Sequence, residues 1–108
     1  MQAVHILVWA VVLRIPLYLF NVSVPLPALP PAPTAYSAMQ AAARHDPQSL
    51  VWDERSIAGH PFVISFGPLA CTRELCWYLT LNNASTALPV DEVPVAPGDV
   101  IEWRYLAL

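Results

Sequence analysis

Basic residues are scarce in this chain, and their scarcity excludes two kinds of partner. The 108 residues include only five Lys and Arg against eight Asp and Glu, the net charge is −3, and the basic residues do not cluster. Nucleic acids and anionic membrane surfaces attract proteins through basic patches. We therefore expect no nucleic-acid partner, and a membrane contact only if the apolar N-terminal segment described below is retained.

Sequence patterns typical of catalysis are also missing. There is no glycine-rich phosphate loop, no paired-histidine zinc motif and no nucleophile elbow. The histidines, His5, His45 and His60, stand in unrelated local settings. Although Asp46 follows His45, adjacent residues at a helix end are more typical of a cap than of a base with its orienting carboxylate. The sequence predicts that the chain is not an enzyme.

Cysteine is limited to two residues, Cys71 and Cys76, which stand five positions apart. One interpretation is a disulfide that closes the short loop 72–75. The other is half of a tetrahedral metal site, which needs two more Cys or His ligands at useful spacing. Because no such ligands are nearby in the sequence, the pattern favours the disulfide, and we expect no directly bound metal.

Two sequons, at Asn21 and Asn83, accompany the cysteine pair and an apolar N-terminus. Sequons of this type accept N-glycans in secreted proteins, and disulfides persist in oxidising compartments. Together these features favour the secretory route. We expect an extracellular glycoprotein modified at Asn21 and Asn83.

The N-terminal segment 1–14 has three interpretations. Its apolar run 3–13 has the length of the hydrophobic region of a signal peptide and is too short to span a bilayer. The run lacks a basic start, and Arg14 separates it from a second apolar stretch, 15–20. A cleaved leader, a membrane anchor and a strand of the mature fold all remain open. We divide the chain into a leader at 1–14 and one domain at 15–108.

The remaining pattern predicts a small α+β domain. Twelve prolines against three glycines exclude a long helical bundle. A strand is expected at 17–24, a proline-rich connector at 25–33, and one amphipathic helix at 35–44 with Thr34 as its N-cap. Short strands are expected at 50–52, 61–66, 76–81, 93–95 and 100–106, separated by turn signals. The fold class is therefore a small antiparallel β-sheet domain with one helix packed on a face.

The last predicted strand shows the clearest alternation in the chain. Ile101, Trp103 and Tyr105 share one face, while Glu102 and Arg104 share the other. Such a period of two is typical of a half-buried strand. We expect the apolar face to lie in the core and the charged face in solvent.

The C-terminal third carries a resemblance to a known family. An aromatic strand at 76–81 leads to Asn82 and Asn83, a short apolar loop at 88–93 and a Gly-Asp turn before the final strand. This order is similar to that of the C-terminal β-domain of transcobalamin, haptocorrin and intrinsic factor. The resemblance covers about residues 15–108 and is strongest from Phe62 onward.

The resemblance implies a non-catalytic carrier of cobalamin. Family members clamp cobalamin between a helical barrel domain and this β-domain, but the 108 residues contain no helical barrel. A cobalamin-capping module is therefore expected, whose partners are cobalamin and a helical barrel domain or another protein. The alternative is an extracellular interaction or adhesion domain without a vitamin ligand. The positions that match the ligand-facing edge are Trp77, Tyr78, Leu79, Ala87, Leu88, Pro89 and Val90. For Trp77 and Leu79, a purely structural role in the core is an open alternative.

Overall fold

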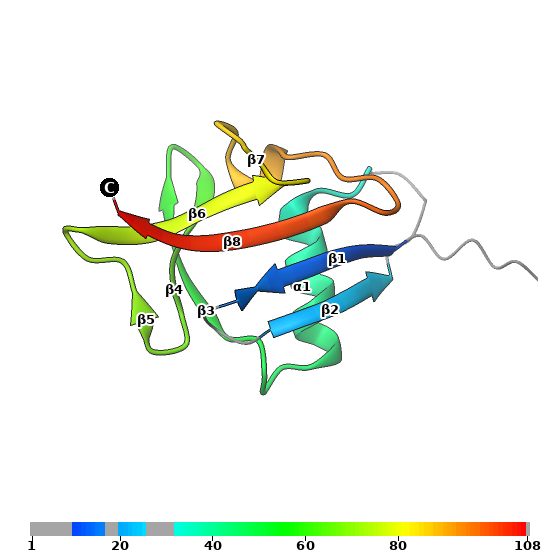
Figure 1. Ribbon diagram of the computed structural model, residues 1–108, viewed down its shortest axis with the longest axis horizontal. Coiled ribbons are helices and arrows are strands. Elements are labelled where there is room, and N and C mark those ends of the chain that lie inside the picture. Colours follow the sequence, from blue (N-terminus) through cyan, green and yellow to red (C-terminus); the bar gives the residue numbers. More distant parts are fainter. Residues whose placement is uncertain (1–9, 17–19, 26–31, 108) are drawn as a thin grey trace, which may run out of the picture.

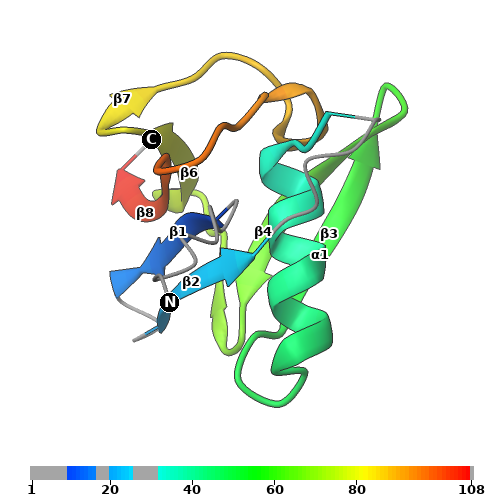
Figure 2. The same cartoon turned by 90° about the vertical axis from the view of Figure 1, so that its right-hand side faces the viewer.

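The strands form two sheets that enclose the core together with one helix. The computed structural model describes residues 10–16, 20–25 and 32–107. The larger sheet has the order β2-β1-β8-β6-β7, and the smaller one has the order β3-β4-β5. Helix α1 lies behind the larger sheet in Figure 1 and beside β3 and β4 in Figure 2. The α+β class predicted from the sequence is confirmed. The elements are β1 (Ala10–Ile15), β2 (Phe20–Pro25), α1 (Ala35–His45), β3 (Trp52–Ile57), β4 (His60–Phe66), β5 (Leu69–Ala70), β6 (Leu75–Leu81), β7 (Ala84–Ser85), the 3-10 helix η2 (Val90–Glu92) and β8 (Val100–Ala107).

Strand β1 occupies an interior position in the larger sheet. It pairs antiparallel with β2 and parallel with β8. The sheet is therefore mixed, whereas the sequence predicted an antiparallel sheet. Val11, Leu13 and Ile15 are all buried, with exposed fractions of 1% or less. The expected boundary between a leader at 1–14 and a domain at 15–108 therefore falls inside a strand. Of the three interpretations left open, the structure shows the strand for residues 10–15, while residues 1–9 lie outside the described residues.

Helix α1 begins and ends close to the predicted positions. The Thr34 hydroxyl accepts a hydrogen bond from the Ser37 amide at 3.2 Å, and the Ser37 hydroxyl accepts one from the Thr34 amide at 2.8 Å. This reciprocal cap satisfies two amides that the first turn leaves without partners. The buried residues of the helix are Ala35, Ala38, Met39, Ala41 and Ala42, whereas Ala43 is only partly buried. Among the described residues, no helix is both long and apolar enough to cross a membrane.

Strand β3 differs from the prediction. A strand was expected at 50–52, but Trp52–Ile57 forms the strand and pairs with β4. Four polar residues follow Trp52, and most of β3 is exposed because β3 is the edge strand of the smaller sheet. Its turn is made by Ala58 and Gly59, whose φ values of 53° and 83° are typical of a two-residue hairpin turn. Pairing with β4, rather than an apolar pattern, therefore defines this strand.

Other predicted elements changed in extent. The expected strand at 93–95 is a single bridge between Thr34 and Pro94, flanked by hydrogen bonds from the Ala35 amide to Val93 and from the Val95 amide to Pro33. The expected strand at 17–24 corresponds to β2, although residues 17–19 lie outside the described residues. The connector at 25–33 is outside them as well, except for its ends. The two-residue strands β5 and β7 were not predicted.

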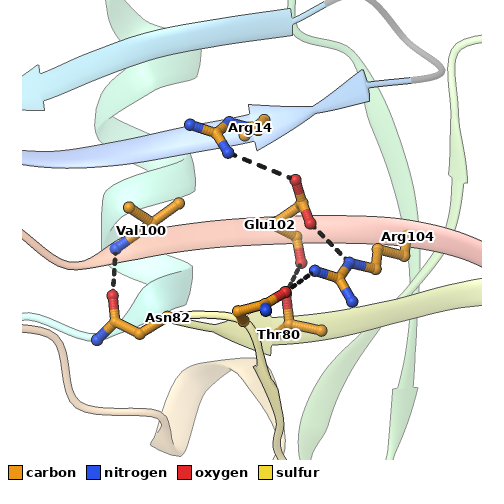
Figure 3. Close-up of polar contacts among 7 residues, drawn as sticks. Arg14, Thr80, Asn82, Val100, Glu102 and Arg104 are labelled. Carbon is orange, nitrogen blue, oxygen red and sulfur yellow. Dashed lines mark hydrogen bonds and ion pairs between the residues drawn. The ribbon is translucent and has the colours of Figure 1, made fainter.

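The alternation along β8 is confirmed, but the surroundings of Glu102 are not those predicted. Ile101 and Trp103 are buried, whereas Glu102 lies on the opposite face of the sheet. Its carboxylate lies 2.6 Å from Arg104 and 3.8 Å from Arg14, and the side chain of Glu102 is only 14% exposed (Figure 3). Glu102 is thus covered by two arginines instead of being fully solvated. The cluster links β1 to β8, and Arg104 extends it by donating to the side chain of Asn83.

Candidate functional site

A groove of about 350 Å³ lies where β4, β6 and the loop 86–90 meet. We call this loop the groove loop. The β3–β4 hairpin forms one wall, the groove loop forms a second, and β6 runs along the base together with Trp103 of β8. The residues predicted to face a ligand all line this groove: Trp77, Tyr78, Leu79, Ala87, Leu88, Pro89 and Val90. The structure therefore brings two sequence-separated segments into one site.

Trp77 and Leu79 lie at the base of the groove and belong to the core as well. Their exposed fractions are 5% and 8%. The Trp77 indole donates a hydrogen bond to the Leu69 carbonyl at 2.8 Å, and its ring lies edge-on to Phe66 with centroids 4.9 Å apart. Both residues therefore have the structural role in the core that the sequence analysis gave as an alternative, and only a small part of each reaches the groove. A contact with ligand stays a prediction for them.

The backbone of β6 offers hydrogen-bonding groups to the groove. The Asn82 amide donates to the Val100 carbonyl at 2.8 Å, in continuation of the β6–β8 register. In an antiparallel pair, the residues that bond the neighbouring strand alternate with residues that point away from it. The N–H and C=O groups of Trp77 and Leu79 therefore point away from β8. Among the described residues, β7 pairs only with positions 80 and 81, so this edge of β6 carries no strand at 77–79.

Large apolar side chains remain exposed around the groove. Ile57, Phe62, Tyr78 and Leu88 have exposed fractions of 47%, 39%, 38% and 50%. Contiguous apolar exposure of this kind marks binding surfaces in soluble proteins. The lining residues include no charged side chain, so the groove suits a ligand with apolar surface and neutral polar groups.

Ile57 and Phe62 were not predicted as site residues. They lie in the β3–β4 hairpin, one before and one after the turn at 58–59, and both line the groove. Ile57 falls outside the strand predicted at 50–52, whereas Phe62 lies in the strand predicted at 61–66, so the hairpin that joins them was not recognised in the sequence. The available signal was a pair of large apolar residues close to a two-residue turn, in a segment that is otherwise polar.

A disulfide holds one end of the groove. Cys71 and Cys76 are bonded, with Cα atoms 4.2 Å apart, and Cys76 lines the groove. The disulfide predicted from the sequence is present. The Cys71 amide donates to the Ile64 carbonyl at 2.7 Å, which ties this end of β6 to β4. No group of three or more His, Cys, Asp or Glu residues that could hold a metal ion occurs in the described part of the chain.

The two predicted glycosylation sites lie away from the groove. Asn21 is exposed on β2 and pairs with Arg14 of β1. Asn83 is exposed in the turn between β6 and β7, where Asn82 and Asn83 have φ values of 51° and 70°. Neither residue lines the groove. Glycans at both positions are therefore compatible with an open site, and their presence stays a prediction.

The chain folds as a small disulfide-bonded α+β domain with an apolar groove, and solved structures show where this fold occurs. No family model matches the sequence, and no curated protein matches it either. In fold, the chain is similar to haptocorrin in complex with Cbi, with a TM-score of 0.76 and 12% identity over 96% of this chain. It spans 27% of the haptocorrin chain. The resemblance predicted from the sequence is thus confirmed at the level of the fold.

A second similar structure comes from Ruminococcus gnavus ATCC 29149, a protein to which metal binding has been ascribed. Its TM-score is 0.57 at 14% identity, and the match covers 92% of this chain and 95% of that one. The fold therefore occurs both within a longer protein and as nearly the whole of a short chain.

Proposed function

We propose that this chain is a secreted cobalamin-binding module of the transcobalamin type that caps one side of the vitamin. One observation carries the proposal. In a fold similar to that of haptocorrin, the residues expected to face the ligand from sequence resemblance all line a single apolar groove. The Cys71–Cys76 disulfide supports an extracellular location, because disulfides form and persist in oxidising compartments.

The chemistry of the groove suits the edge of a corrin ring. Leu88 and Phe62 provide apolar contacts from opposite walls, and the backbone groups of β6 at 77 and 79 are placed to bond peripheral amides. No histidine is among the described residues that line the groove, so the proposed mode of binding uses no side-chain ligand to cobalt from them. Binding in this mode is non-covalent and leaves the vitamin chemically unchanged.

The size of the groove indicates that it forms one side of a site. Its volume of about 350 Å³ is at the lower end of the range for drug-sized ligands, and a corrinoid is larger than these. A ligand held here keeps much of its surface free while the fixed entropic cost of association remains. In the family that the sequence resembles, a helical barrel covers the other side. When this second domain is tethered to the first, its effective concentration at the bound ligand is high, which raises the affinity for the ligand.

Titration calorimetry with hydroxocobalamin tests the proposal. For the chain alone we expect weak binding, with a Kd on the order of micromolar or higher, because only one wall is present. Addition of a separate helical barrel domain from a carrier protein should tighten binding by about tenfold or more. No heat in either titration, with circular dichroism showing a folded chain, would reject the carrier function.

Leu88→Ala separates a ligand contact from a structural effect. Leu88 is 50% exposed in the groove loop, so its truncation should change the stability of the domain by less than about 0.5 kcal/mol. If Leu88 contacts the ligand, cobalamin binding should weaken by about five- to tenfold. Leu106→Ala is the matched control, since Leu106 is 47% exposed and does not line the groove. Equal affinities for the two variants would remove Leu88 from the site.

The second candidate is an extracellular protein-interaction domain without a vitamin ligand. Because the fold makes up nearly all of the Ruminococcus gnavus chain, it does not require a second domain. The exposed apolar residues of the groove would then contact a protein partner. If the folded chain gives no heat in either titration, this second candidate remains.

A further inference from the structure

His60 connects the two walls of the groove through both of its ring nitrogens. It is the first residue of β4 and faces η2, the 3-10 helix that begins at Val90, the last residue of the groove loop. Its Nδ1 atom lies 3.1 and 3.0 Å from the two carboxylate oxygens of Asp91, and its Nε2 atom lies 3.4 Å from Oε1 of Glu92. No other side-chain hydrogen bond or ion pair joins the β3–β4 hairpin to η2 in the described residues.

The protonation state of His60 decides how many of these contacts are hydrogen bonds. A neutral imidazole carries one N–H, so one of the two nitrogens must present a lone pair to a carboxylate. The imidazolium carries two N–H groups and can donate to Asp91 and Glu92 together. The hydrogen bond to Asp91 raises the pKa of His60 above its usual 6.5, and the charges of Asp91 and Glu92 act in the same direction against an opposing effect of burial.

Other charged groups near this contact are already engaged or make no contact with His60. On the hairpin, Glu54 accepts hydrogen bonds from the Tyr36 hydroxyl of α1 and from the Trp52 indole. Asp53 accepts one from the Ser65 hydroxyl. Arg55 forms no ion pair with Asp91 or Glu92 within the described residues. The two carboxylates of η2 are therefore the charged groups that interact directly with His60.

The position of η2 makes this contact important for the groove. Val90, its first residue, is buried and lines the groove, while Ala87 and Leu88 just before it are exposed. On the other side of η2, the Ala35 amide of α1 donates to the Val93 carbonyl at 2.9 Å. The chain is thus fixed after η2, and His60 fixes η2 itself against the hairpin. Among the described residues, the hydrogen bonds of the groove loop are local, such as that from the Leu88 amide to the Thr86 hydroxyl.

We infer that His60, Asp91 and Glu92 form a proton-controlled clasp that holds the groove loop against the β3–β4 hairpin. The clasp is closed when His60 is charged and weakened when it is neutral. The inference rests on the proposed function only in that the groove is taken as the ligand site. A group whose pKa is raised by folding stabilises the folded state below its unfolded pKa, and this contribution is lost as the pH rises through the folded value. The groove is therefore held most firmly in weak acid.

Hydrogen exchange of the intact chain tests the clasp without any ligand. The peptide 86–92 should be about fivefold better protected at about pH 5.5 than at about pH 8, after correction for intrinsic exchange rates. In His60→Gln this difference should disappear, because the amide side chain keeps one charge state at both pH values. His45→Gln is the control, since His45 is exposed at the end of α1 and forms no ion pair among the described residues.

A titration followed by NMR provides the second measurement. The His60 ring should titrate with a midpoint above 6.5 in the parent chain, and Asp91→Asn should lower that midpoint while the domain stays folded. A midpoint at or below 6.5, or the same pH dependence of protection in His60→Gln as in the parent, would overturn the clasp. Neither measurement uses cobalamin. A failed cobalamin titration with these results intact rejects only the vitamin ligand, and the reverse outcome rejects only the clasp.

Discussion

Replacement of Trp103 by alanine should unfold the domain or bring it close to unfolding. Trp103 is 5% exposed, its ring centroid lies 5.6 Å from that of Phe66, and its indole donates to Sδ of Met39 at 3.3 Å. The side chain thus joins β8 to both α1 and β4. Removal of a buried tryptophan costs about 3–5 kcal/mol, which is a large part of the 5–15 kcal/mol that typically holds a domain folded.

Glu102→Ala is the matched control in the same strand. Glu102 lies on the opposite face and loses its contacts with Arg14 and Arg104, so we expect a cost of about 1 kcal/mol rather than none. Chemical denaturation followed by tryptophan fluorescence and circular dichroism measures both variants. If Glu102→Ala were the more damaging of the two, the register of β8 would be wrong by one residue.

The strands that the sequence predicted well are those whose burial is one-sided. In β8 the period of two is visible because one face meets the core and the other meets solvent, so each side chain reports its own environment. β3 lacks this signal, because Asp53 and its neighbours are exposed on both faces and only pairing with β4 makes them a strand. A pairing partner is a tertiary property that local pattern does not contain.

The site was predictable only in part. The groove loop and β6 carry the order of residues that resembles the transcobalamin family, and the structure brings both to one groove. The turn between Ile57 and Phe62 has a local signal, but the position of this hairpin as a wall of the groove depends on the assembled fold. His60 likewise meets Asp91 across 31 positions of sequence. Contacts of that separation depend on the assembled fold.

The apolar run 3–13 shows how a pattern fits more than one structure. A run of eleven residues, apolar except for His5, fits the hydrophobic region of a signal peptide, and such a pattern fits equally well a strand that is covered on its core face and flanked by two other strands. For residues 10–15 the structure shows the strand. Composition alone does not distinguish these, because the difference lies in whether β8 is available as a parallel neighbour.

Leu13→Ala measures how much the fold depends on β1. Leu13 has no exposed surface, so its truncation should cost about 2–5 kcal/mol. Arg14→Ala, one position on, is the control: the side chain of Arg14 is 44% exposed and its ion pair with Glu102 spans 3.8 Å. Exposed pairs of this kind contribute about 0–1 kcal/mol. Denaturant midpoints of the two variants should therefore differ clearly, and equal midpoints would place β1 outside the cooperative unit.

A chain that begins at Ile15 should be destabilised more than Leu13→Ala, and it tests the predicted domain boundary directly. Such a chain lacks nearly all of β1, so β2 loses its antiparallel partner and β8 loses its parallel one. Val11 and Leu13 leave the core at the same time, which exposes the sheet face beneath α1. We expect no cooperative thermal unfolding and fast exchange of the amides in β8. A truncated chain that unfolds cooperatively, with the parent's near-ultraviolet circular dichroism, would support the predicted boundary after residue 14 and show that the segment before it is dispensable for the fold.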